Sequence, residues 1–173
     1  MENPNLVDKG ECFQAYPRRS MITPEEFQRL IPLACRWAET QERLIAETGR
    51  PLTADEQQLA RRMGIMRVER IRVLTVDKVP APDQAQLRIA AQQVGLFGSE
   101  TAGMTLRYGI FIQKNSAEDR RLLAHELGHV KQFERMGGFR AFMERYLFEC
   151  MIIGYPNTPM EQEADEMAER VAA

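Results

Sequence analysis

The two histidines of the chain lie four residues apart, at positions 125 and 129, and a glutamate follows the first of them at position 126. In an α-helix, residues four apart differ by about 40° around the axis, so His125 and His129 project from one face. Two neutral imidazoles in this arrangement can share one metal ion. The carboxylate of Glu126 then lies beside the metal, within reach of a metal-bound water but not as a ligand. The spacing predicts a catalytic zinc site with Glu126 as the general base.

A catalytic zinc ion needs a third protein ligand and an open fourth position. Since there is no third histidine, the ligand is expected to be an acid, a cysteine or an outside group, and Glu161 and Asp165 lie four residues apart in the C-terminal segment. On a helix they share one face, so one can bind the metal while the other orients a histidine through its second ring nitrogen. Glu161 is the preferred ligand, although its position three residues after Thr158 also fits a capping box. Glu163 is the alternative.

The helix that must position the motif is predicted from Ser116 to Met136. Ser116 followed by Asp119 resembles a capping box at its start, and two glycines at positions 137 and 138 can end it. An apolar stripe at helical spacing would face the core, and it consists of Leu122, Leu123, Leu127, Val130 and Phe133.

Other segments supply the scaffold. Caps and periodicity typical of helices occur in five further segments, at residues 23–48, 53–64, 83–94 and 139–153 and from 158 onward. Pro32 is expected to kink or split the first of these helices. Residues 66–79 and 104–113 are predicted strands. As an edge strand, 104–113 could hold an extended peptide above the metal, with close approach at Gly103 and Gly109; it could equally be an internal strand. The expected fold is α+β, a small sheet packed against the motif helix and several flanking helices.

The bulk composition limits the partners. The chain has 173 residues and is 44% hydrophobic, which suits one domain at 23–173 after an arm at 1–22. Its net charge of −2 favours a peptide or protein substrate over nucleic acid. No stretch is long and apolar enough for a membrane span, and three scattered cysteines without a signal peptide suggest the cytoplasm. Cys12 on the arm could cap the metal and hold the enzyme latent, or simply pack against the domain. Oligomeric state is not indicated.

The motif pieces HELGH and EQEAD, with the preceding LRYGIFIQ, resemble the gluzincin metallopeptidases, including CaaX-processing proteases, over roughly Leu106 to Ala168. The resemblance implies a zincin-like fold, zinc as the cofactor, His125, His129 and Glu161 as its ligands, and Asp165 as the residue that supports a ligand. The chain lacks the transmembrane helices of the membrane enzymes and is much smaller than thermolysin-like enzymes. Its first hundred residues match no family in this way.

The expected reaction is peptide-bond hydrolysis. A zinc-bound water attacks the carbonyl while Glu126 accepts its proton and passes it to the leaving amine. The negative oxygen of the intermediate needs a further donor, for which Tyr155 and Tyr108 are candidates, although a buried aromatic role is the plainer explanation for both.

Two alternatives stand beside the peptidase. One is a non-catalytic zincin-like interaction or regulatory module, which the intact Glu126 argues against. The other is a toxin or effector protease directed at one particular protein, which the lack of a signal peptide does not exclude because specialised export can bypass it.

Overall fold

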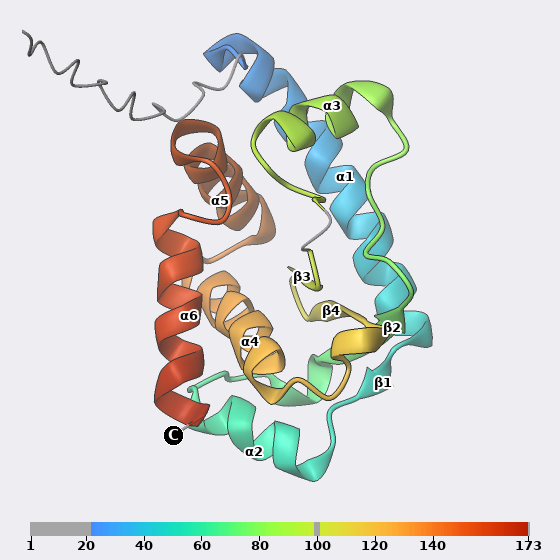
Figure 1. The fold of residues 1–173 in the computed structure, drawn as a ribbon, viewed down its shortest axis with the longest axis vertical. Coiled ribbons are helices and arrows are strands. Elements are labelled where there is room, and N and C mark those ends of the chain that lie inside the picture. Colours follow the sequence, from blue (N-terminus) through green and yellow to red (C-terminus); the bar gives the residue numbers. More distant parts are fainter. Residues whose placement is uncertain (1–21, 99–100, 173) are drawn as a thin grey trace, which may run out of the picture.

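The structure is a computed structural model that describes residues 22–98 and 101–172. Residues 1–21, and with them Cys12 of the predicted arm, lie outside the described residues. The described chain confirms the expected α+β class (Figure 1). Its helices and strands are α1 (Pro24–Thr48), β1 (Arg50–Pro51), α2 (Ala54–Arg62), β2 (Arg72–Val76), α3 (Ala85–Gln93), β3 (Gly103–Leu106), β4 (Gly109–Gln113), α4 (Arg120–Arg135), α5 (Phe139–Ile153) and α6 (Pro159–Ala172), with short 3-10 turns at Val68–Arg70 and Lys114–Ser116.

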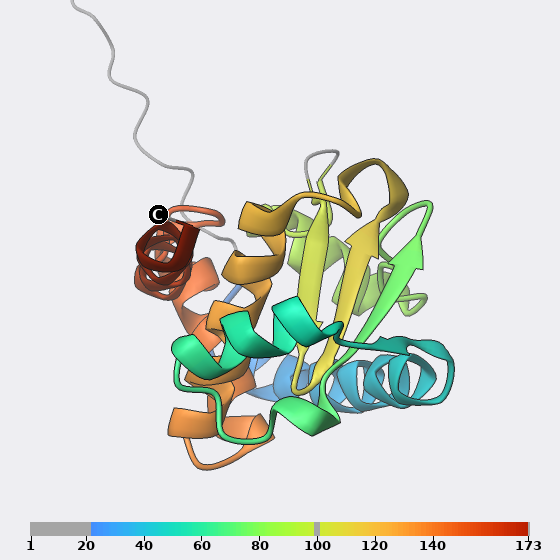
Figure 2. The same ribbon diagram turned by 90° about the horizontal axis from the view of Figure 1, so that it is seen from below.

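The strands form one mixed sheet in the order β1-β2-β4-β3. Strands β2 and β4 run parallel, and the other neighbouring pairs are antiparallel. Figure 2 shows β3 at one side of the sheet, next to α4, with α1 crossing the strands. The motif helix therefore packs beside an edge strand of the described sheet, β3. Of the two possibilities left open for residues 104–113, the edge position applies to β3 and the internal position to β4.

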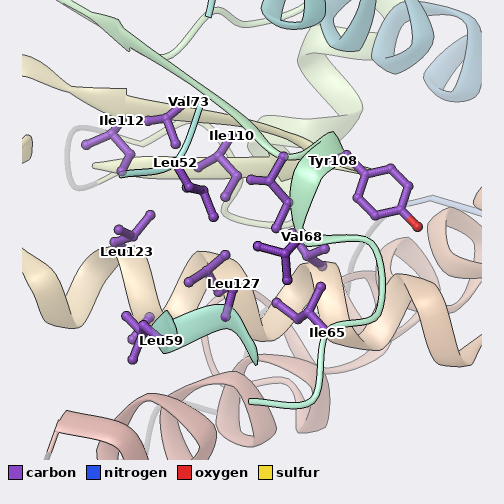
Figure 3. Packing of buried hydrophobic residues seen from close by; sticks show 14 of the residues in the cluster. Leu52, Leu59, Ile65, Val68, Val73, Tyr108, Ile110, Ile112, Leu123 and Leu127 are labelled. Carbon is purple, nitrogen blue, oxygen red and sulfur yellow. The ribbon is translucent and has the colours of Figure 1, made fainter. Parts of the chain in front are cut away.

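One face of the sheet packs on α4 and α2 through a closely packed apolar core (Figure 3). Because side chains alternate along a strand, Val73 of β2 and its partner Ile110 of β4 both point to this face. They meet Leu127 of α4, which is fully buried. This core holds the motif helix at a fixed distance from the sheet.

The opposite face of the sheet packs on α1 and α5. Phe111 of β4 is fully buried there, with Ala38 and Ile45 of α1 and Phe142 of α5 in the same cluster. Of the two effects expected of Pro32, a kink or a split, the split does not occur, because α1 continues past it to Thr48. A long unbroken α1 thus spans the sheet and reaches α5.

The segment 104–113 is a hairpin and not the single strand that the sequence suggested. Strand β3 turns back into β4 through Arg107 and Tyr108. Arg107 adopts a φ of 57°, a conformation that asparagine or glycine would normally signal in a tight turn. Its guanidinium is held by Glu39 at 2.8 Å and lies over the ring of Phe139, which compensates for the strained backbone.

Two further boundaries differ from prediction. Strand β2 is shorter than 66–79, because the backbone N–H groups of Met66 and Arg67 donate to the carboxylate of Glu134 on α4 and draw that part of the chain out of the sheet. The motif helix is capped by Asp119 and not by Ser116: one carboxylate oxygen of Asp119 accepts from two N–H groups of the first helical turn.

Among the helices at residues 22–98 and 101–172, none has the length and apolar character required to cross a bilayer.

Candidate metal centre

Three side chains from two helices converge on one point. The Nε2 atoms of His125 and His129 on α4 lie 3.2 Å apart. Each also lies 3.2 Å from a carboxylate oxygen of Glu161 on α6, His125 from Oε2 and His129 from Oε1. Tetrahedral coordination with bonds of about 2.0–2.1 Å places neighbouring ligand atoms about 3.3 Å apart. The spacing of these donors therefore fits a small tetrahedral metal ion, for which they form a candidate site.

Glu161 is directed into this site by the start of α6. The Thr158 hydroxyl accepts from the Glu161 N–H at 3.3 Å, so the backbone half of the predicted capping box forms. The carboxylate of Glu161 instead faces the histidines and is only 4% exposed. Burial alone would raise the pKa of Glu161, but hydrogen bonds to His125 and His129 outweigh it and hold that pKa well below its usual range. The low pKa of Glu161 favours the ionised form of the carboxylate, which is the form that binds a metal.

A close contact between helices brings Glu161 within reach of the histidines. Helices α4 and α6 lie side by side (Figure 1). A Cβ atom placed on Gly128 would lie 3.0 Å from the Cα of Ala164, which is fully buried. Larger residues at either position would force the helices apart. Gly128, inside the motif, therefore serves the approach of the two helices.

Each histidine is oriented through its second ring nitrogen. The Nδ1 atom of His125 lies 2.9 Å from Asp165, as the spacing of Glu161 and Asp165 suggested. The Nδ1 atom of His129 lies 2.9 Å from the amide oxygen of Gln132. Because the amide nitrogen of Gln132 donates to Met160 O and to Glu163, its oxygen must accept, so Nδ1 of His129 carries the proton. Both Nε2 lone pairs then remain for a metal.

Glu163, the alternative third ligand, is not part of the converging group. Its carboxylate pairs with both terminal nitrogens of Arg135, at 2.6 and 2.8 Å, and accepts from Gln132 at 3.0 Å. These bonds hold Glu163 behind His129. In the structure, Glu163 accepts a hydrogen bond that fixes the orientation of the Gln132 amide.

The predicted base, Glu126, lies between α4 and the edge strand. Thr105 pairs with Ile110, so it points toward α4, and its hydroxyl donates to Oε2 of Glu126 at 2.6 Å. On the same face, a Cβ atom on Gly103 would lie 2.3 Å from Oε1 of Glu126, so glycine leaves the space that the carboxylate occupies. Burial raises the pKa of Glu126 above its ordinary value, as is useful for a group that must both accept and release a proton.

The structure separates the two tyrosines considered as donors. Tyr155 lines the same cavity as His125 and Glu126, and burial raises the pKa of its hydroxyl to about 12, which keeps the O–H intact at neutral pH. Its N–H donates to Val94 O, where Gly95 with a φ of 90° ends the α3 region. Tyr108 lies elsewhere, in the core beneath α4, with its hydroxyl on Glu134.

Tyr146 of α5 is part of the site, although it was not singled out from the sequence. Its hydroxyl donates to Oε1 of Glu161 at 2.7 Å, and its ring packs edge-on against His129. Tyr146 therefore fixes the carboxylate against the histidines. Nothing local in the sequence indicates that this tyrosine has a polar partner.

The site opens into a mostly apolar cavity of about 130 Å³ between β3 and helices α1, α3 and α5. The charged side chains that line it within the described chain are the site residues His125, Glu126, His129 and Glu161. The candidate metal donors and the buried carboxylate of Glu126 thus lie together in the lining of a space that is otherwise mostly hydrophobic.

Residues 53–137 match the family model of the eCIS core domain, where eCIS denotes an extracellular contractile injection system. The matched stretch contains Gly103, Thr105 and the whole of α4, and ends before Tyr146 and Glu161. No curated protein and no solved structure matches the chain.

Proposed function

We propose that the protein is a zinc-dependent metallopeptidase, with His125, His129 and Glu161 as metal ligands and Glu126 as general base. The observation that carries the proposal is the convergence of the two Nε2 atoms and both Glu161 oxygens at 3.2 Å spacing, beside a buried carboxylate that is not part of the group. A purely structural zinc site uses four protein ligands. In the described part of the chain three protein donors converge, with a base at their side, and this arrangement favours a catalytic site.

Zinc bound by this donor set would polarise a carbonyl and lower the pKa of a coordinated water to about 7. Glu126 would be the acceptor for a proton of the attacking water, and Thr105 would hold its carboxylate in place for that role. The raised pKa of Glu126 favours this acceptance, and Glu126 then delivers the proton to the more basic leaving amine. Tyr155 offers an O–H to the oxygen that becomes negative.

The edge strand supports a peptide as the substrate. Strand β3 pairs with β4 on one side only within the described sheet, and its residues Gly103 and Thr105 face the base. An extended peptide can pair with the other edge of β3 through main-chain hydrogen bonds and present one carbonyl to the site. Gly109, which also seemed suited to close approach, packs against Ile45 and has no part in this surface.

The match to the eCIS core domain supports a second, compatible candidate, an effector-associated role in which the chain acts with or upon other proteins of an injection system. A non-catalytic version of this role would not need Glu126. If Glu126→Gln abolishes the biological effect of the protein while metal and fold are retained, the role depends on hydrolysis; an undiminished effect would favour a binding module.

The test is elemental analysis of untagged protein after zinc is offered and the excess removed. We expect one zinc per chain in the wild type and in Glu126→Gln, and none in His129→Ala or Glu161→Ala. Glu163→Ala serves as the matched control, since its carboxylate binds Arg135 and Gln132 and should not be needed for stoichiometry. Zinc retained by Glu161→Ala but lost by Glu163→Ala would overturn the ligand assignment.

Hydrolysis is tested separately on a mixture of peptides analysed by mass spectrometry. Zinc-loaded wild type should cleave members of the mixture that zinc-loaded Glu126→Gln leaves intact. Equal cleavage by the two proteins would exclude Glu126 as the base.

A further inference from the structure

The cavity beside the metal donors is formed largely by residues outside the catalytic group. Its walls come from α1 on one side, α3 on a second and α5 on a third. Helices α1 and α5 lie outside residues 53–137, the part of the chain that matches a known family. The cavity is therefore formed jointly by the matched stretch, which supplies α3 and β3, and by helices outside it, α1 and α5.

The size of the cavity restricts its occupant. A volume of about 130 Å³ is close to that of engineered apolar cavities, about 150 Å³, that hold one benzene molecule. One leucine or phenylalanine side chain fits such a space. Away from the site, the lining offers no charged partner among the described residues, so a lysine, arginine or acidic side chain would lose its hydration without compensation.

Three alanines keep the cavity open. Ala34 of α1 and Ala90 and Ala91 of α3 line it, and all three are nearly inaccessible to solvent. Trp37 and Phe97, which meet edge-on at 5.6 Å, belong to the same lining. Aromatic walls with small residues between them suit a bulky apolar side chain, because they provide contact area and leave room.

We propose that this cavity is the specificity pocket of the enzyme and receives one large apolar side chain, such as leucine or phenylalanine, next to the bond to be cleaved. The inference rests on the proposed metallopeptidase function, because the metal donors at the mouth of the cavity define which bond is cleaved. It adds the substrate class, which is a peptide with a large aliphatic or aromatic residue at the scissile position.

The experiment measures binding of amino-acid hydroxamates to zinc-loaded protein by calorimetry. The hydroxamate group binds zinc, and the side chain samples the pocket. Burial of a large apolar side chain should make leucine and phenylalanine hydroxamates bind about tenfold to a hundredfold more tightly than glycine hydroxamate. Lysine hydroxamate should gain nothing over glycine.

Two variants fill the pocket from different walls, Ala34→Leu and Ala91→Leu. Each should retain zinc and glycine hydroxamate binding while the preference for leucine and phenylalanine falls to within about threefold, since the added methyl groups occupy the space. Ala46→Leu is the matched control, because it makes the same change at an exposed position of α1 and should keep the full preference. Equal binding of glycine and leucine hydroxamates by the wild type would overturn the inference, as would a preference that both filled variants retain.

A second measurement separates the pocket from the metal. Benzene added to the same preparations should raise the melting temperature of the wild type and of Ala46→Leu, but not that of Ala34→Leu. If no hydroxamate binds while benzene stabilises the protein, the metal assignment fails and the pocket stands. If benzene has no effect and the hydroxamates bind without preference, the pocket fails and the metal assignment stands.

Discussion

Gly103 provides a sharp test of the base, because a single added methyl group should displace it. The Cβ atom of Gly103→Ala would lie 2.3 Å from Oε1 of Glu126, whereas ordinary van der Waals contact begins at 3.4 Å. The carboxylate must therefore move by about 1 Å. A misplacement of this size can lower an enzymatic rate by about 100-fold. The end of the Glu126 side chain can rotate, so the change should cost little stability.

The expected result is a protein that binds one zinc and unfolds near the wild-type temperature, but hydrolyses peptides about 100-fold more slowly. Metal content, thermal unfolding and peptide cleavage are measured on the same preparation. Only the last should change, since Gly103 touches none of the three metal donors.

Gly109→Ala, in the other strand of the hairpin, is the matched control. Its Cβ atom would meet the branched side chain of Ile45 in the core, at 2.9 to 3.2 Å. This variant should lose stability and keep its activity per folded molecule. The reasoning would be refuted if Gly103→Ala hydrolysed peptides at the wild-type rate, because Glu126 would then not act from the position described.

Three further predictions concern the supporting residues and pH. Asp165→Ala should weaken zinc binding about 10- to 100-fold in a chelator competition, because the Nδ1 atom of His125 loses its partner, whereas Glu166→Ala, on the same helix, should not. Tyr155→Phe should retain zinc and lower the hydrolysis rate by about 100-fold if its hydroxyl stabilises the negative oxygen; an unchanged rate would exclude that role. In metal-free protein, burial alone would lower the pKa of His125. The hydrogen bond to Glu161 and the charge of Glu126 outweigh burial and raise this pKa from its ordinary value of 6.5 to about 9. The resulting stabilisation is complete below about pH 6.5, the unfolded pKa, and is lost as the pH rises through 9. The melting temperature of metal-free protein should therefore fall as the pH rises from about 6.5 to 9. The increase in melting temperature that zinc causes should become larger over the same range. A metal-free melting temperature that stays constant would contradict this prediction.

The parts of the site that follow from helix geometry could be predicted from the sequence. His125 and His129 face one point because four residues make about one helical turn, and the pairing of Glu161 with Asp165 follows the same spacing. The preference for Glu161 over Glu163 as the third ligand could also be predicted, since Asp165 lies on the same helix face as Glu161 and can support a histidine ligand from there. The structure brings Glu161, and not Glu163, to the histidines.

Residues that depend on the packing of distant elements could not be predicted. Thr105 reaches Glu126 because of the register of β3 against β4, and Tyr146 reaches Glu161 because α5 packs against α6. The hairpin itself was hidden, because Arg107 takes the turn conformation without glycine or asparagine and is held there by Glu39. Such contacts leave no periodic signal along the chain.

The contact between Gly128 and Ala164 has a consequence for ion selectivity. These residues touch through backbone and Cβ atoms, which cannot adjust as long side chains do, and they fix how far apart the helices that carry the donors lie. A calcium ion binds six to eight oxygens at about 2.3–2.6 Å and would need a wider and richer shell than two imidazoles and one carboxylate. In the proposed metal site, the contact between these helices would therefore limit the radius of a bound ion from a point that no ligand atom occupies, and it would favour small transition-metal ions over alkaline-earth ions.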